Sequence, residues 1–182
     1  MTEPATDKSF FETFPEIELG DDITRFFSKV KITSLCVLKK SEKFVIKAVS
    51  SILIPAEVTA QVEKEISEKF SLNTEIKLKF TLDMPFEKIL AEYWDSLIYI
   101  VNSNIALSRG ILNGCQWELS GETLDITLAT RGSRILKSQG CDRLIEDILE
   151  YSFGKKCRVN FRDCEIDEDF REKYIEFIEN EE

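Results

Sequence analysis

The order strand, strand, helix, strand is expected twice in this chain, and any fold must accommodate both copies. Alternating apolar and β-branched residues predict the strands, and apolar residues three and four positions apart predict the helices. The first copy comprises a hairpin over residues 32–49, a helix over 55–70 and a strand over 75–80. The second comprises a hairpin over 115–129, a helix over 133–153 and a strand over 157–161. We therefore predict an α+β fold built from two tandem small β-β-α-β modules.

Two short helices are expected before the first hairpin. The spacing of Phe10, Phe11 and Phe14 predicts one, and apolar residues between 23 and 30 predict another, which Asp21 or Asp22 is placed to cap. Five of the 13 phenylalanines lie in the first 27 residues. This density favours packing of the helical pair against the body of the fold over an exposed docking patch.

The strongest helical pattern begins after Asp83, which is placed to cap it, with Pro85 in the first turn. Its broad apolar stripe contains Phe86, Ile89, Leu90, Tyr93, Trp94, Leu97, Ile100 and Val101. A shorter helix is expected over residues 105–112, so the second module takes the order α-α-β-β-α-β. Gly132 and Gly140 interrupt the last helical stretch, which we expect in two parts.

The chain divides into three parts on this interpretation. Residues 1–83 hold the helical pair and the first module, residues 84–164 the second module, and residues 165–182 an acidic helix. That last segment contains nine acidic and two basic residues and only one thin apolar edge. Such a helix usually continues into, or rests against, something else, so we expect it to lead to further domains.

The net charge of −10 is concentrated at the two ends of the chain. Residues 23–164 contain 18 acids and 21 bases, so the acidic pI of 4.8 does not exclude a nucleic-acid partner. No apolar run approaches the ~20 residues of a spanning helix, and the acidic start is unlike a signal peptide. Five cysteines without CxxC spacing, and no secretory signal, indicate a reducing cytoplasm.

No catalytic, cofactor-binding or metal-ligating residue is assigned. The chain lacks histidine, the commonest general base and a common zinc ligand. Four alternating acids are spaced as in a calcium loop: Asp163, Glu165, Asp167 and Asp169. The glycine and the glutamate that such a loop needs are replaced by Glu168 and Tyr174. Acids gathered at a helix N-terminus are therefore the favoured interpretation, and no cofactor is expected in this chain.

Nucleic-acid binding is the other chemistry to weigh. A KH-type module needs two glycines three positions apart, and no two glycines here have that spacing. Basic residues do cluster, at Lys39, Lys40, Lys43 and Lys47, at Arg131, Arg134 and Lys137, and at Lys155, Lys156, Arg158 and Arg162. Most such side chains on an α/β surface are simply solvated, so we expect at most weak, non-specific contact with phosphates.

Tyr93, Trp94 and Trp117 could form a stacking platform for single strands. Trp94 lies on the apolar stripe of its helix, however, and is expected in the core. Trp117 has polar neighbours in its strand, and its exposure stays open.

The whole chain resembles the amino-terminal region of PolC-type replicative DNA polymerase III alpha subunits of low-GC Gram-positive bacteria. The similarity rests on SFFETF at residues 9–14, the hairpin at 32–49 and LDMPFEKILAEYWDSLI at 82–98. The hairpin with Gly121, Leu124 and Ile126, and the acidic segment from Asp167 onward, complete the pattern. These are patterns of apolar and aromatic residues, with no catalytic signature among them.

The resemblance implies that an OB-fold, a PHP domain with an inserted proofreading 3′–5′ exonuclease, and a Mg²⁺-dependent polymerase core follow this region. The second module resembles DnaA domain I and the carboxy-terminal domain of the clamp-loader tau subunit, a topology close to type II KH domains. Those relatives mediate protein contacts, which implies a replisome protein as partner, with tau as the first candidate. The family's catalytic aspartates have no counterparts here, so the chain by itself is expected to be no enzyme.

Two functions therefore remain open: a protein-interaction and positioning module of a replicative polymerase, and a KH-like nucleic-acid module without its glycine loop. The missing GxxG favours the first. The slight excess of basic over acidic residues between positions 23 and 164 keeps the second function open.

Overall fold

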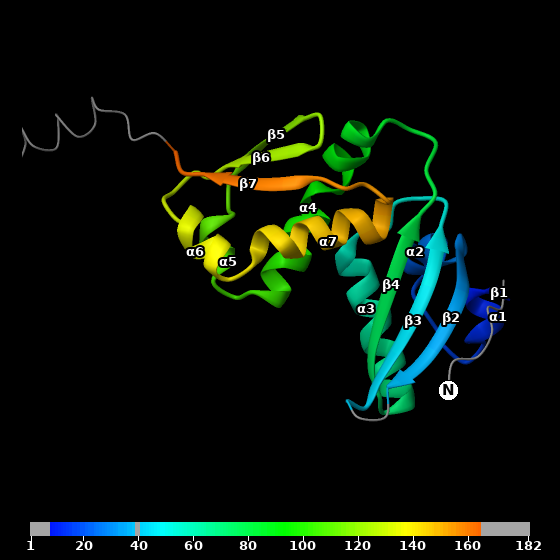
Figure 1. The fold of residues 1–182 in the computed structure, drawn as a ribbon. Coiled ribbons are helices and arrows are strands. Elements are labelled where there is room, and N and C mark those ends of the chain that lie inside the picture. Colours follow the sequence, from blue (N-terminus) through cyan, green and yellow to red (C-terminus); the bar gives the residue numbers. More distant parts are fainter. Residues whose placement is uncertain (1–7, 39–40, 165–182) are drawn as a thin grey trace, which may run out of the picture.

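Two separate β-sheets, each with helices packed on one face, make up the fold (Figure 1). The computed structural model describes residues 8–38 and 41–164. The first part of the chain contains β1 (Lys8–Ser9), α1 (Phe10–Thr13), α2 (Asp21–Phe27), β2 (Val30–Leu38), β3 (Lys43–Ser50), α3 (Ala56–Phe70) and β4 (Asn73–Phe80). The second contains α4 (Phe86–Asn104), α5 (Ser108–Ile111), β5 (Gln116–Ser120), β6 (Thr123–Thr127), α6 (Ser133–Ser138), α7 (Cys141–Phe153) and β7 (Arg158–Arg162).

The connections within the two sheets are the same. In the first sheet, β2 and β3 form an antiparallel hairpin, and β4 returns through α3 to pair in parallel with β3. In the second, β5 and β6 form the hairpin, and β7 returns through α6 and α7 to pair in parallel with β6. The two hairpins do not pair with each other. The predicted α+β fold with two β-β-α-β units is confirmed.

The two copies correspond residue by residue from the helix to the closing strand, at a constant offset of 83 positions. Four pairs of buried apolar residues follow this offset: Val62 and Ile145, Ile66 and Leu149, Ile76 and Val159, and Leu78 and Phe161. The turn after each helix also corresponds, since Ser71 and Gly154 both adopt the left-handed conformation. The doubled pattern in the sequence is thus a doubled structure.

A glutamate occupies the same place in both copies. Oε1 of Glu63 in α3 accepts the backbone N–H of Ile76 in β4 at 2.6 Å. Oε1 of Glu146 in α7 accepts the backbone N–H of Val159 in β7 at 2.8 Å. Because β4 and β7 lie at the edges of their sheets, these N–H groups have no neighbouring strand to bond. Each glutamate satisfies one of them and ties the helix to the strand.

Aromatic side chains join the two modules. Phe80, at the end of β4, stacks on Phe153 at the end of α7 with 5.2 Å between ring centroids. The ring of Tyr93 in α4 lies 5.4 Å from Phe80 and 5.2 Å from Phe153. A buried hydrogen bond adds to this contact, because the N–H of Ala56 in α3 donates to Oγ of Ser96 in α4 at 3.1 Å. Figure 1 shows α7 reaching the upper end of β4.

The aromatic residues near the amino end pack as expected. Phe10, Phe14 and Phe27 are almost fully buried, and the ring of Phe10 lies 4.8 Å from that of Phe27. Ser9 and Glu12 form a reciprocal capping box that begins α1. The acidic helix expected over residues 165–182 lies outside the described residues.

Several expected helix boundaries are wrong in detail. Asp83 does not cap α4; Pro85 is itself the N-cap residue, and no side chain caps this end. Proline suits that position because it has no N–H to leave unpaired. In α2, Asp21 and Asp22 lie inside the first turn after Gly20, where they face the positive end of the helix dipole. The helix expected over residues 105–112 is shorter, with bounds Ser108–Ile111. The last helix is in two parts, as predicted.

Candidate interaction surfaces

The two tryptophans meet at the edge of the second module. Trp94 in α4 and Trp117 in β5 lie 5.5 Å apart with their rings inclined at 33°. Trp94 was expected in the core, but it is only half-buried; its neighbour Tyr93 takes the core position, at 5% exposure. The reason is geometric. Successive helix residues lie ~100° apart, so when Tyr93 faces Phe80, Trp94 turns toward the edge strand β5.

Apolar residues extend this edge on both elements. Ile98 follows Trp94 by one turn of α4, so the two side chains lie on one side of the helix. Leu119 follows Trp117 by two positions in β5, so the two side chains lie on one face of the strand. All four are half-buried against the core. β5 is an edge strand of its sheet. We call these four residues the tryptophan edge.

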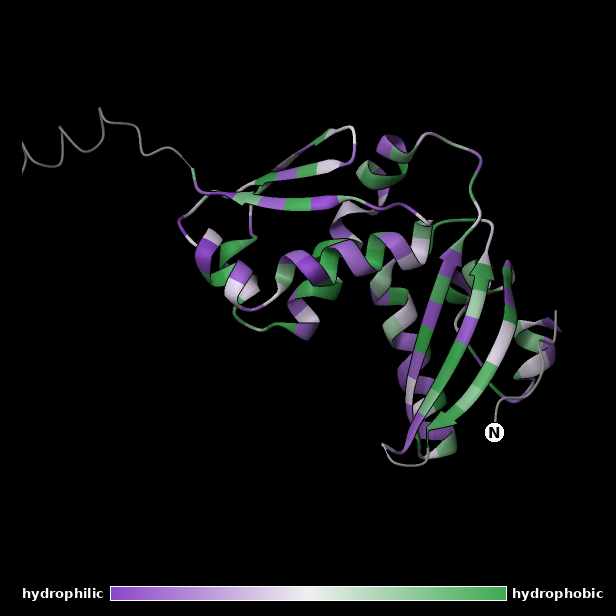
Figure 2. Cartoon of the chain, viewed as in Figure 1, coloured by the Kyte–Doolittle hydropathy of each residue, from purple (hydrophilic) through white to green (hydrophobic). Residues whose placement is uncertain are grey.

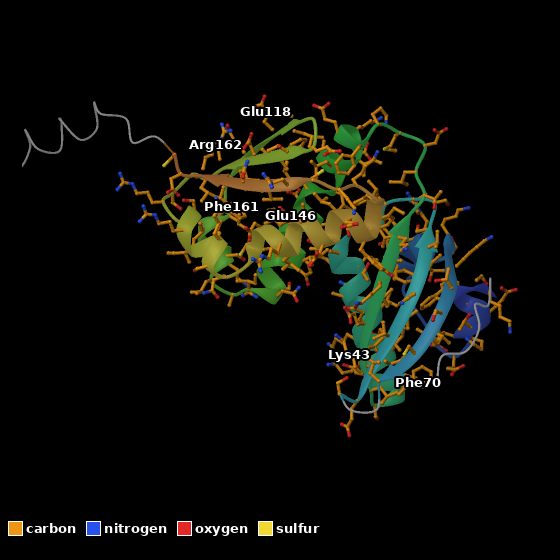
Figure 3. All side chains as sticks on the ribbon, viewed as in Figure 1. Lys43, Phe70, Glu118, Glu146, Phe161 and Arg162 are labelled. Atoms are coloured by element: carbon orange, nitrogen blue, oxygen red, sulfur yellow. The ribbon has the colours of Figure 1, made fainter. Side chains whose placement is uncertain are left out.

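The outer face of the second sheet is polar and balanced in charge. Arg162 in β7 pairs with Asp125 in β6 at 3.0 Å, and the side-chain amide of Asn160 donates to Asp125 at 3.3 Å. Figure 3 shows Arg162 and Glu118 pointing away from the helices and Phe161 pointing toward them. Two acids, Glu118 and Asp125, thus face two bases, Arg158 and Arg162, on this surface.

The basic residues noted in the sequence lie on several elements of the structure. Lys39 and Lys40 lie outside the described residues. Arg131, Arg134 and Lys137 lie in and before α6, whereas Lys155 and Lys156 follow α7. Lys43 and Lys47, in contrast, lie on the outer face of the first sheet, where lysines from two other strands join them. Proximity in the sequence does not reveal this grouping, because its lysines come from three different strands.

Asp163 binds a helix end. Its carboxylate accepts the N–H groups of Gly132 and Ser133, each at 2.8 Å, and the Ser133 hydroxyl at 2.8 Å. These hydrogen bonds lower the pKa of Asp163. Asp163 thus binds the N-terminus of α6, whereas the helix at whose start the four acids were expected lies outside the described residues. Glu165, Asp167 and Asp169 lie outside the described residues, within which no three metal-ligating side chains gather.

The titratable groups offer little nucleophilic chemistry. Burial raises the pKa values of Cys115, Cys141 and Cys157, which disfavours the reactive thiolate. Burial also raises the pKa of Glu63 to about 7, and the hydrogen bond that Glu63 accepts from the Ile76 N–H opposes that rise.

An open hollow between β6, α7 and β7 is lined by groups of both charges: Glu122, Thr123, Glu146, Lys156, Cys157 and Arg158. No helix in the described part of the chain is long and apolar enough to cross a membrane.

Two family models match the chain. One, described as DNA polymerase III polC-type N-terminus I, matches residues 9–80, and the other, described as DNA polymerase III polC-type N-terminus II, matches residues 92–182. The first range ends with the last residue of β4, and the second begins within α4. No curated protein matches the chain, and no solved structure does.

Proposed function

The chain belongs to the PolC-type DNA polymerase III family as its amino-terminal region, and we propose that this region is a non-catalytic module that docks another replisome protein. The polymerase and exonuclease activities belong to domains that follow it in the whole protein, which acts in the cytoplasm. This region positions those domains within the replisome. The clamp-loader tau subunit is the first candidate partner, because the second module resembles small domains that make protein contacts in replication.

The tryptophan edge carries this proposal. Tryptophan is enriched among the residues that dominate the energy of protein interfaces, and an aromatic cluster beside an unpaired edge strand offers both apolar area and backbone hydrogen bonds. Trp94 and Trp117 are half-buried and in contact, so the free protein already holds them in one arrangement. A partner that covers them loses little conformational entropy in ordering these side chains.

The test is a calorimetric titration of the chain with purified tau at physiological salt. We expect binding, and we expect Trp117→Ala to weaken it by a factor of ~30 or more, as loss of a hot-spot residue does. Ile135→Ala is the matched control, because Ile135 is an exposed apolar residue of the same module, on α6. Circular dichroism establishes that both variants are folded.

Two results would contradict the proposal. One is the absence of binding to tau and to the other purified replisome proteins. The other is equal affinity of the Trp117→Ala and Ile135→Ala variants for the partner, which would place the docking surface elsewhere.

A further inference from the structure

One face of the first sheet carries no helix. In Figure 1 the strands β2, β3 and β4 face the viewer, while α3 and the short helix α2 lie behind them and α1 lies beside β2. Figure 2 shows hydrophilic and hydrophobic residues alternating along β4. Even-numbered residues of β3 and β4, such as Ile46 and Leu78, are buried toward the helices. Because side chains alternate between the two faces of a strand, the odd-numbered residues of β3 and β4 form the outer face.

Lysine dominates this outer face. Five lysines and one acid lie on it: Lys31 from β2, Lys43 and Lys47 from β3, and Glu75, Lys77 and Lys79 from β4. Lys47 and Lys77 are direct partners in the parallel register, and Lys79 is the partner of Val49, which also pairs with Lys31. We call these six residues the lysine face. Its formal charge is +4.

Few contacts offset this charge. Glu75 pairs with Lys43 at 2.7 Å and with Lys77 at 3.7 Å. The ammonium group of Lys79 lies 5.1 Å from the ring centroid of Tyr151 in α7. Lys31 and Lys47 make no ion pair with any residue that the structure describes. Like charges directly opposite on neighbouring strands are destabilising. The stability of the fold therefore does not explain why lysines occupy both position 47 and the opposite position 77.

The second module provides an internal comparison. An uncovered sheet face has to be polar, and mixed charges satisfy that need without repulsion. The outer face of the second sheet does so, with Glu118 and Asp125 against Arg158 and Arg162. The first sheet, with the same topology, has an excess of four positive charges instead. The excess is therefore specific to this copy.

The chemistry of the face selects a polyanion whose charges are closely spaced. Lysine is depleted in protein–protein interfaces, whose centres are apolar. Between the lysines of β3 and β4, Val45 is only 7% exposed and Val49 is half-buried, and the one exposed apolar residue of the described face, Leu38, lies at its margin, at the end of β2. A protein partner would bury little apolar area on it. Phosphate binding needs only positive charge and is served by lysine as a point charge.

We propose that the lysine face binds the phosphate backbone of nucleic acid without reading its sequence. This function goes beyond the docking of a protein at the tryptophan edge and uses the other module. With no aromatic platform or base-reading groove on the face, affinity is weak and depends steeply on salt.

The test is a fluorescence-anisotropy titration of labelled oligothymidylate with the chain at about 50 and 200 mM salt. We expect binding at low salt, weakened at least ~10-fold by Lys47→Glu/Lys77→Glu, with the slope of log affinity against log salt reduced by ~1.4 for two lost contacts to a single strand. The matched control is Lys156→Glu/Arg158→Glu, which makes the same change in net charge on the second module and should leave the affinity close to that of the unaltered chain.

Three results would overturn the proposal. No binding of oligothymidylate at low salt is the first. Equal loss in the two double variants is the second, because it would show an effect of net charge alone. The third is binding of polyglutamate as tight as that of the oligonucleotide, which would make the face a site for acidic proteins.

Discussion

Replacing Phe80 by alanine is expected to lower the free energy of unfolding by ~3–5 kcal/mol, the usual cost of truncating a core phenylalanine. Phe80 is 9% exposed and contacts Tyr93 and Phe153, which belong to the second module. Both tryptophans of the chain also lie in that module, so tryptophan fluorescence reports on its unfolding. If the modules unfold together, a substitution in β4 shifts the urea midpoint seen by fluorescence.

Phe70→Ala is the control supplied by the repeat. Phe70 holds in α3 the position that Phe153 holds in α7, but it is 37% exposed, and Figure 3 shows it at the far end of the first module. Its removal should cost about 1 kcal/mol, as for a partly exposed side chain. Equal midpoints for Phe80→Ala and the unaltered chain would show that the two modules unfold independently.

A second large effect concerns pH. The pKa of Glu63 is about 7 in the folded chain, against an ordinary value of 4.5, so the folded state retains a proton that the unfolded state has released between these values. Stability from this group is therefore complete below pH 4.5 and is lost as pH rises through 7. The loss amounts to at most ~3 kcal/mol.

Glu63→Gln removes this dependence, because glutamine stays neutral and its Oε1 can still accept the Ile76 N–H. In urea titrations at pH 5 and pH 8, we expect the difference in stability to be smaller in the variant, which should be the more stable protein at pH 8. Glu65→Gln removes an exposed carboxylate from the same helix and serves as control. The same pH difference in Glu63→Gln and in the unaltered chain would contradict the interpretation.

Much of the fold could be predicted because each element has a local signal. Gly121 adopts a positive φ of 62° at the second hairpin turn, and the alternation in residues 75–80 indicated the buried face of β4. The offset of 83 positions between the helices and closing strands of the two copies was also present in the sequence. The structure adds that Ile76 and Val159, which are related by this offset, each pair in parallel with the second strand of their hairpin, at Ile46 and Leu124.

Contacts between distant elements could not be predicted. Nothing in the periodicity of α7 indicates that Phe153 packs on Phe80, and Trp94 looked like a core residue because helical spacing cannot tell which side of a stripe meets solvent. The lysine face requires the parallel register of β3 and β4, which places Lys47 beside Lys77. The pairing register is set by how both faces of the sheet pack, so it cannot be derived from the sequence of a single strand.

The most direct test of the docking function uses the full-length polymerase that carries this region, compared with its Trp94→Ala/Trp117→Ala variant in primer extension with and without tau. We predict that the rate of single-nucleotide incorporation without tau is the same in both, while the stimulation of extension by tau is lost in the variant. A variant that incorporates nucleotides more slowly in the absence of tau, or that tau still stimulates fully, would contradict a non-catalytic docking module.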